Sequence, residues 1–334
     1  MTDRLSDRER YGFLEIEDAP REDLPAPAFV DETPVDRLRD LRAALPALTG
    51  SVLRTVEVIG RPGTEVGEFA QPRGMCLDQW GRLYVVDSAA NRVQKIAPEG
   101  DVWVYSGATH DRRASLREPV DIAVDALEMM YVLDREGCRV QKIGPDAEYQ
   151  RTFAMPGQGR GQLWYPSGIA IDSRHTLYIA DTWNRRISVF GPNGRFRDIW
   201  LGQAVGGFDL PAGVAVTRDD EVVVCDTNNH RLVVLNREAV CLDIVEGWTG
   251  GHRLFCAPVD VAEDPFGSLW VVEAKGRRLV KMSRDGTCLN TFGPGLSADL
   301  GSLGCATSVC VRPDADMYIC DAAAGRVLRV GYRD

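Results

Sequence analysis

The chain repeats one pattern of apolar and charged positions six times. In each copy an apolar run, such as LYVVD or MYICD, ends at an acid, and an arginine follows five positions later. Successive acids lie 45 to 48 residues apart, and a second β-rich run begins at each arginine. The pattern predicts a hairpin in which the acid ends one strand, four residues turn, and the arginine opens the next strand. The six pairs are Asp87 and Arg92, Asp134 and Arg139, Asp181 and Arg186, Asp226 and Arg231, Glu273 and Arg278, and Asp321 and Arg326.

Each copy also predicts two further strands. One precedes the hairpin and has a small residue at its middle, which suits the crowded centre of a radial array; these residues are Cys76, Ala123, Ala170, Ala215, Ala262 and Cys310. A fourth strand lies between copies, at 102–105, 151–155, 195–200, 241–245 and 288–292. A period near 47 residues with four short strands indicates an all-β fold, a β-propeller of six blades.

The sixth copy has no fourth strand of its own, because the chain stops shortly after RVLRV. The segment VLRTVEVIG at 52–60 has the character of such a strand and stands just before the first copy. We therefore expect this N-terminal strand to complete the last blade and cover an otherwise exposed sheet edge. The propeller is predicted to span residues 51–334.

The repeat carries a motif of glycine, proline, acid and arginine at fixed positions. The first copy shows it as Gly67, Phe69, Pro72, Gly81, Asp87 and Arg92, and the third as Gly161, Pro166, Gly168, Asp181, Asn184 and Arg186. This pattern resembles the NHL-repeat family of β-propellers over roughly residues 52–334. The resemblance implies four-stranded blades and, as in most NHL propellers, a protein or RNA partner.

Residues 1–50 differ from the repeats and are predicted to form an extended, acidic N-terminal arm. They hold twelve acidic and seven basic residues, about half of the net charge of −10. Thr33 and Pro34 resemble a helix start, so a short amphipathic helix is expected over 33–45. Its apolar face is a candidate partner-binding stripe, docking either on its own propeller or on a neighbour; it consists of Val35, Leu38, Leu41 and Leu45.

Composition narrows the function class. The net charge of −10 argues against a broad grip on nucleic acid, which needs Lys and Arg against phosphates. The sequence holds neither an apolar run of about 20 residues nor a secretory h-region, so no membrane insertion is expected. Nine cysteines without a CxxC motif favour a reducing compartment, and the predicted localisation is cytoplasmic.

Candidate chemistry is sparse. Six equivalent acid–arginine pairs are interpreted as structural ion pairs, because catalysis needs one site with a perturbed environment. No nucleophilic triad, phosphate loop or dinucleotide fingerprint is present, so no catalytic residue is assigned.

The residues that open the innermost strands should rim a central channel: Gly74, Asp121, Gly168, Gly213, Asp260 and Ser308. Asp121 and Asp260 are the candidate metal ligands, yet two carboxylates are few for Ca²⁺, which takes six to eight oxygens. No cofactor is expected, and Ca²⁺ or another divalent cation is the alternative.

One face of the ring should gather the hairpin turns that follow each acid, and we call it the turn face. Aromatic and arginine side chains, which are enriched at interface hot spots, should lie there. The candidates are Trp164, Tyr165, Trp183, Trp248, Arg135, Arg185 and Arg277.

The favoured function is a non-enzymatic protein-interaction scaffold, a structural subunit of a larger assembly. NHL-type propellers also occur in phage-tail-like and contractile-injection baseplates, so a contractile injection system is one such assembly. The alternatives are a metal-dependent lactonase or lyase and an RNA-binding NHL protein.

Overall fold

The computed structural model describes residues 52–107, 114–246, 248–249, 252–253, 256–273, 277–293 and 303–333. They belong to one compact unit that begins at Leu45, and residues 1–44 form a separate unit. The arm and the helix expected over 33–45 lie outside the described residues. No helix within the described ranges is long and apolar enough to cross a membrane.

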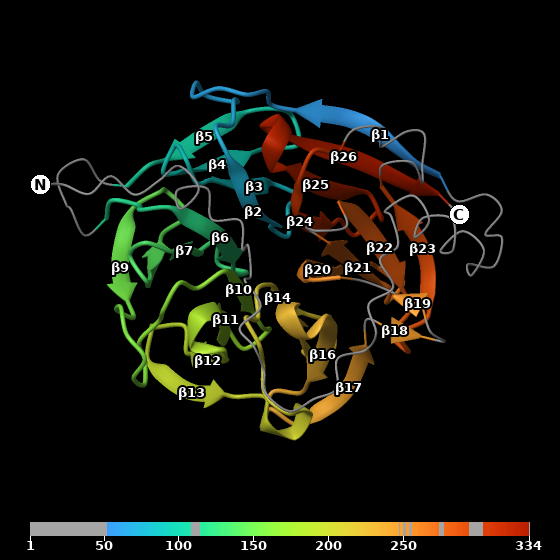
Figure 1. Cartoon of the computed structure of the whole chain (residues 1–334). Helices are drawn as coiled ribbons and strands as arrows, with labels where there is room; N and C mark the ends of the chain where they lie inside the picture. Colours follow the sequence, from blue (N-terminus) through green and yellow to red (C-terminus); the bar gives the residue numbers. More distant parts are fainter. Residues whose placement is uncertain are drawn as a thin grey trace, which may run out of the picture. The chain divides into compact units, whose positions relative to one another are not determined.

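The fold is a ring of six four-stranded antiparallel sheets, as predicted (Figure 1). Blades one to three contain β2 (Pro72–Leu77), β3 (Leu83–Asp87), β4 (Arg92–Ile96), β5 (Val102–Tyr105); β6 (Pro119–Val124), β7 (Met130–Asp134), β8 (Arg139–Ile143), β9 (Tyr149–Phe153); and β10 (Gly168–Ile171), β11 (Leu177–Asp181), β12 (Arg186–Phe190), β13 (Phe196–Trp200). Blades four and five contain β14 (Val214–Val216), β15 (Val222–Asp226), β16 (Arg231–Leu235), β17 (Cys241–Glu246); and β20 (Pro258–Glu263), β21 (Leu269–Glu273), β22 (Arg278–Met282), β23 (Cys288–Phe292). A two-stranded hairpin that the repeat did not predict, β18 (Trp248–Thr249) with β19 (His252–Arg253), follows blade four.

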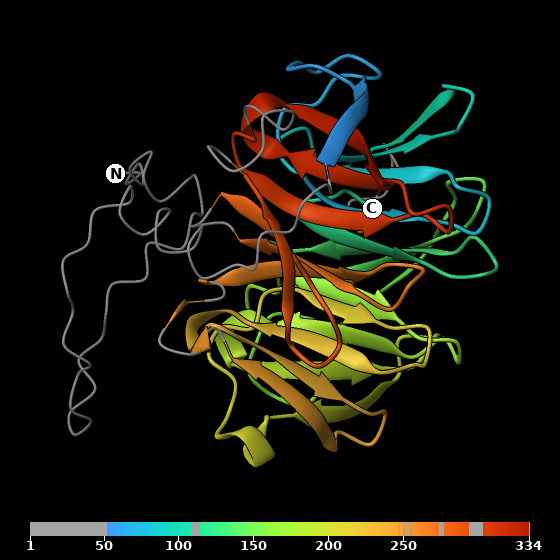
Figure 2. The same ribbon diagram turned by 90° about the vertical axis from the view of Figure 1, so that its right-hand side faces the viewer.

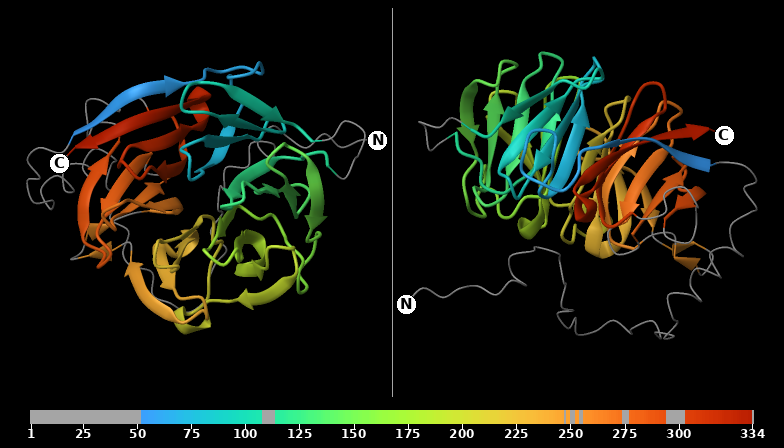
Figure 3. Two further views of the ribbon diagram at one scale, coloured as in Figure 1. Left: turned by 180° about the vertical axis from the view of Figure 1, so that it is seen from behind. Right: turned by 90° about the horizontal axis from the view of Figure 1, so that it is seen from above.

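Blade six closes the ring with strands from both ends of the described chain. It contains β24 (Ala306–Val311), β25 (Met317–Asp321) and β26 (Arg326–Arg333), and its outermost strand is β1 (Val52–Ile59). β1 pairs antiparallel with β26, with Leu53 opposite Tyr332 and Val58 opposite Leu328. Figures 2 and 3 show the two strands side by side from other directions. The predicted closure is confirmed.

The core consists of six layers, one between each pair of neighbouring blades. The layer between blades one and two, for example, packs Tyr84 and Val86 against Ile122 and Val132. All five residues of each second strand are buried, because these strands face a neighbouring blade on both sides. Burial of apolar surface between blades therefore supplies most of the stabilisation, at about 25 cal/mol per Å².

The hairpin turns share one backbone feature that the sequence pattern did not reveal. The residue before each arginine adopts a left-handed conformation, and these residues are Asn91, Cys138, Arg185, His230, Arg277 and Gly325. In three blades the turn is a short 3₁₀ segment: η1 (Thr182–Asn184), η3 (Thr227–Asn229) and η4 (Ala322–Ala324). A further 3₁₀ segment, η2 (Gln203–Val205), lies in the loop before blade four. Two strands depart from their predicted bounds by two residues or more. β9 ends at Phe153 and not at residue 155, because Ala154 is left-handed and Pro156 follows, and β26 runs three residues beyond RVLRV to Arg333.

Candidate functional site

The six acid–arginine pairs all form ion pairs at the turn face. Their N···O distances run from 2.5 to 3.3 Å, and all six acids are fully buried. Burial raises the pKa of Asp134, Asp181 and Asp226, and hydrogen bonds from their partners oppose the shift. Six equivalent pairs in the same environment single out no reactive member. Their structural role stays a prediction until stability is measured.

Each pair also holds the loop that leads into its blade. Asp181 accepts a hydrogen bond from the Trp164 N–H at 2.7 Å, and Arg186 donates to the carbonyl oxygens of Gln158 and Gln162 at 2.8 Å. The acid in every other blade likewise accepts an N–H from a residue 17 positions earlier. The pairs thereby fix the backbone of the turn face.

Three exposed aromatic side chains meet on the turn face of blade three. Trp164, Tyr165 and Trp183 are 37%, 43% and 55% exposed. The ring centroids of Tyr165 and Trp183 lie 5.1 Å apart, and those of Trp164 and Tyr165 lie 6.3 Å apart in an edge-to-face arrangement. We call these three residues the aromatic cluster. The sequence pattern placed each residue on this face, but their mutual contact emerges only in the folded chain.

The arginines predicted for this face differ in availability. Arg185, next to the aromatic cluster, is exposed and lies 3.5 Å from Asp209. Arg277 is also exposed and donates to the Leu303 carbonyl oxygen at 3.2 Å. Arg135 is mostly buried against Glu118 at 3.2 Å, and burial lowers its pKa to about 10. Arg135 is therefore less available to a partner than Arg185 or Arg277. The side chain of Trp248 lies outside the described residues.

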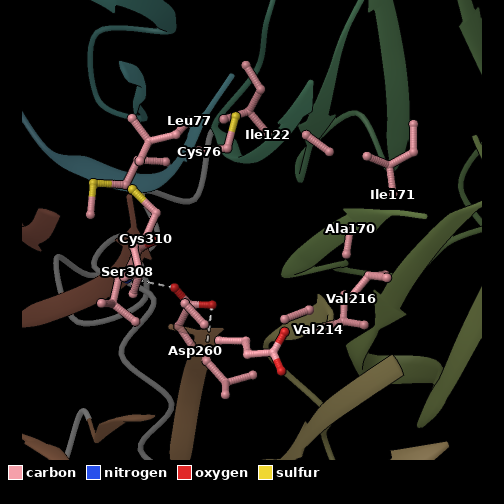
Figure 4. A pocket seen from close by; sticks show the side chains of 18 of the residues that line it. Cys76, Leu77, Ile122, Ala170, Ile171, Val214, Val216, Asp260, Ser308 and Cys310 are labelled. Atoms are coloured by element: carbon pink, nitrogen blue, oxygen red, sulfur yellow. Dashed lines mark hydrogen bonds between the residues drawn. The ribbon is translucent and has the colours of Figure 1, made fainter. Parts of the chain in front are cut away.

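A cavity of about 740 Å³ occupies the axis of the ring, where innermost strands of all six blades converge. The small residues predicted for this centre line it: Cys76, Ala123, Ala170, Ala215, Ala262 and Cys310. The end of the cavity toward the turn face is lined by Asp121 of blade two, Asp260 of blade five and Ser308 of blade six. The opposite end is lined by Arg218, Glu263 and Arg312. Figure 4 shows Asp260 beside Ser308, with apolar side chains around the remaining space.

Asp121 and Asp260 tie neighbouring blades together at the axis. Asp121 accepts the N–H of Ile169 at 2.8 Å, and Asp260 accepts the N–H of Val309 at 2.9 Å, each on the next blade. Both carboxylates keep some surface on the channel but lie deep among protein atoms. This desolvation raises the pKa of Asp260 to about 6 and raises the pKa of Asp121 well above its usual range, with the charge of Asp260 adding to the second shift.

Close approach between blades explains the glycines beside these acids. A Cβ atom on Gly213 would lie 2.5 Å from the Val259 carbonyl oxygen, and one on Gly74 would strike Asp121. A Cβ on Gly168 would lie 2.5 Å from the Ala212 carbonyl oxygen. The channel rim therefore has side chains at only three of its six positions.

The fit of a metal ion to this rim is poor. Within the described ranges, no group of three or more His, Cys, Asp or Glu residues could hold a metal ion. His230 serves the turn instead, since its Nδ1 accepts the Ala257 N–H at 3.0 Å. The channel cysteines are half-buried thiols, and desolvation raises the pKa of Cys76 and Cys310, which favours their neutral form.

A second repeated contact, at the opposite face, was missed in the sequence. Asp78 accepts the N–H groups of Trp80 and Arg82 and the hydroxyl of Tyr84. The same arrangement recurs with Asp125 and Tyr131, Asp172 and Tyr178, and Asp264 and Trp270. An aspartate followed six residues later by Tyr or Trp, in four copies, is the signal that marks it.

Comparison with known proteins agrees with this architecture. Three segments match the NHL repeat: residues 69–96, 163–190 and 208–235. No curated protein matches the sequence of the chain. A solved streptogramin B lyase structure is similar, with a TM-score of 0.59, 13% identity, and coverage of 86% of this chain and 100% of that chain.

Two further solved structures extend the comparison. A chain in the structure of a nidogen/laminin complex has a TM-score of 0.56 and 20% identity, and covers 73% of this chain and 94% of its own length. A structure described as a putative gluconolactonase has a TM-score of 0.57 and 13% identity, and it covers 86% of this chain and 94% of its own length. Identities this low show a shared fold and nothing finer.

Proposed function

Because this chain is a six-bladed β-propeller of the NHL-repeat family, we propose that it is a non-enzymatic protein-binding module and a structural subunit of a larger assembly. The observation that carries the proposal is the aromatic cluster. Trp and Tyr are enriched at interface hot spots because they bury much area and lose little rotamer entropy. Three such side chains in mutual contact, each more than a third exposed, form a ready anchor for a partner.

The backbone beneath the aromatic cluster favours rigid recognition. Trp164 is fixed through its N–H to Asp181, and the Trp183 N–H donates to the Trp164 carbonyl oxygen at 3.2 Å. A surface held in place before binding loses little entropy when a partner docks. The acidic net charge favours protein over RNA as that partner. The nine cysteines form no disulfide, which supports a cytoplasmic location.

The proposal also covers the kind of assembly and the role of the N-terminal arm. A phage-tail-like or contractile-injection baseplate is one assembly that would need such a rigid subunit. The stripe of Val35, Leu38, Leu41 and Leu45 would provide a second contact, either on this propeller or on a neighbouring subunit.

Site-specific photo-crosslinking in the source cells tests the proposal. A crosslinking residue replaces Arg185, which is exposed beside the aromatic cluster, in one strain and Trp80 in another, because Trp80 is exposed, at 51%, but lies on the opposite face. We expect one protein to crosslink from position 185 but not from position 80. Equal yields from both faces would contradict a partner on the aromatic cluster.

A metal-dependent lactonase or lyase is the second candidate function. It is favoured by Asp121 and Asp260 in the channel and by the fold shared with a lyase and a gluconolactonase structure. Calorimetric titration of Ca²⁺ into the full chain distinguishes it from the first proposal. Binding that disappears in both Asp121→Asn and Asp260→Asn would favour the enzyme.

A further inference from the structure

We propose that the central channel binds an organic cation, namely a primary ammonium group carried on an elongated apolar body. The inference is independent of the protein-binding proposal, because it concerns the axis of the ring and not the aromatic cluster. It rests on the shape of the cavity, on its apolar wall, and on the placement of two carboxylates toward one end.

The wall of the channel suits an apolar body. Its middle is lined by the alanine and cysteine ring, flanked by residues such as Val214, Val216 and Ile171 (Figure 4). The innermost strands rise about 3.3 Å per residue, so the three steps from Asp121 to Val124, or from Asp260 to Glu263, span roughly 10 Å of the lining. Binding pockets for small molecules are typically apolar clefts of this size with a few placed polar groups.

The two carboxylates indicate that the ligand carries a positive charge. Asp121 lies on β6 and Asp260 at the same position on β20, and these innermost strands of blades two and five stand on opposite sides of the axis (Figure 1). Asp121 accepts the N–H groups of Ile169 and Ile122, and Asp260 accepts those of Val309 and Val261 and the hydroxyl of Ser308. A carboxylate has about four lone-pair sites, so about two sites on Asp121 and one on Asp260 remain for a ligand.

An ammonium group has three N–H donors and a compact charge, so it can donate to the free sites of a carboxylate at this end and offset the negative charge of the pair. At this end of the channel an anion would be repelled, and a neutral ligand would leave both charges uncompensated. The arginines of the lining, Arg218 and Arg312, lie toward the opposite end and form ion pairs with Glu263 and Asp314.

A divalent metal fits these residues less well than an ammonium group. Calcium takes six to eight oxygens, whereas the carboxylates and Ser308 provide few on a rim otherwise made of glycine. Among the described residues the channel also has no histidine in its lining. An alkylammonium ion needs only hydrogen bonds and gains further free energy from the apolar wall.

Isothermal titration calorimetry with hexylamine tests the site on the full-length protein at pH 8. Hexanol and hexanoate are matched controls, because they keep the apolar body and replace the cation by a neutral group or an anion. We expect saturable one-to-one binding of hexylamine, with hexanol at least about 10-fold weaker, since hydrogen bonds to charged groups exceed neutral ones. Hexanoate should not bind. Equal affinities of hexylamine and hexanol, or no binding of hexylamine, would overturn the proposal.

Isosteric variants locate the binding. Asp260→Asn and Asp121→Asn keep the shape of the side chain and an acceptor for the next blade, and each should weaken hexylamine at least about 10-fold. Asp219→Asn, which removes an exposed acid outside the channel, should leave the affinity unchanged. Ala215→Phe, which fills the channel, should abolish binding of both hexylamine and hexanol. Unchanged affinity in both aspartate variants would contradict the site, and so would Ca²⁺ displacing hexylamine.

The pH dependence gives an independent measurement. Besides each other, the titratable groups that interact electrostatically with the two acids are Cys76, Cys225, Cys310 and Cys320, whose raised pKa values keep them neutral between pH 5 and 8. The other charged residues of the lining, Arg218, Glu263 and Arg312, lie toward the opposite end. Hexylamine affinity should therefore rise from pH 5 to pH 8 as the carboxylates ionise, and binding should release protons into the buffer. Affinity that is flat with pH and proton release of zero would contradict the assignment.

Discussion

Asp181 and Arg186 form a buried pair whose Oδ2···Nε distance is 2.7 Å, and the same carboxylate fixes the backbone of Trp164. The ion pair therefore links the stability of blade three to the position of the aromatic cluster. Five other blades repeat the pair, but only blade three carries exposed aromatic rings in mutual contact among the described residues.

Replacing Asp181 by alanine should destabilise the propeller by about 3–5 kcal/mol, because Arg186 is left buried without its partner. Asp134→Ala should cost a similar amount, since its carboxylate is also fully buried and lies 2.8 Å from Arg139. Urea denaturation of each variant measures the free energy of unfolding. The control is Asp314→Ala, whose pair with Arg312 is half exposed and worth only about 0–1 kcal/mol. A loss below about 1 kcal/mol at Asp181 would show that the pair is not a structural tie.

Truncation tests the closure of blade six. Removal of residues 1–50 leaves β1 intact, so the melting temperature should stay within a few degrees of the full chain. Removal of residues 1–60 deletes β1, exposes the edge of β26 and removes Leu53, which is fully buried. We expect a large fall in melting temperature or aggregation, because unpaired edges template further pairing. Equal stability of both truncations would contradict closure by β1.

The repeat predicted the ring because its signals are local. Each hairpin contains an acid, a turn of four residues and an arginine. The spacing of the acid and the arginine in the sequence therefore predicts that the two side chains are in contact. Closure was also predictable, since one missing strand and one spare strand leave a single solution. The second aspartate contact, between Asp78 and Tyr84 and its equivalents, was equally local and could have been found.

The candidate site was less accessible from sequence, because it depends on contacts between blades. Trp183 lies in a turn, and its ring lies 5.1 Å from that of Tyr165, which belongs to the loop before blade three. The left-handed backbone of Tyr165 turns its side chain, and residue spacing does not report that conformation. Likewise, Arg135 was expected to offer its charge to a partner, but Glu118 from the preceding loop encloses it.

Neutralising Asp260 should stabilise the ligand-free protein at high pH. Its folded pKa of about 6 lies above the usual value for aspartate, so the native state binds more protons than the unfolded state. The contribution of Asp260 to stability is therefore present at low pH and is lost as the pH rises through about 4 to 6. Asp260→Asn and the wild type should have similar stability at pH 4.

At pH 8 the variant should be more stable than the wild type, by on the order of 2–3 kcal/mol. Thermal melts of both proteins from pH 4 to pH 8 measure the difference in their stability. Groups that titrate in both proteins contribute equally to the two melts and do not affect this difference. A difference that is constant across this range would show that the pKa of Asp260 is not raised.

The channel rim should tolerate no side chain at Gly213. A methyl group there would lie 2.5 Å from the Val259 carbonyl oxygen and 2.8 Å from the Asp260 Cα atom, both parts of the next blade. Gly213→Ala should cost about 1–3 kcal/mol, the usual range for overpacking. Ala262→Gly, which removes a methyl group from the same channel without a clash, is the control for changes at the axis. A neutral Gly213→Ala variant would mean that the blades separate easily.

The affinity of the purified protein for its crosslinked partner tests the central claim most directly. Biolayer interferometry compares the wild type with Trp183→Ala and with Trp80→Ala, a change of the same size on the opposite face. Truncation of a hot-spot tryptophan costs at least about 2 kcal/mol, so Trp183→Ala should weaken binding roughly 30-fold while Trp80→Ala leaves it unchanged. Equal affinities of the two variants and the wild type would contradict a protein-binding role for the aromatic cluster.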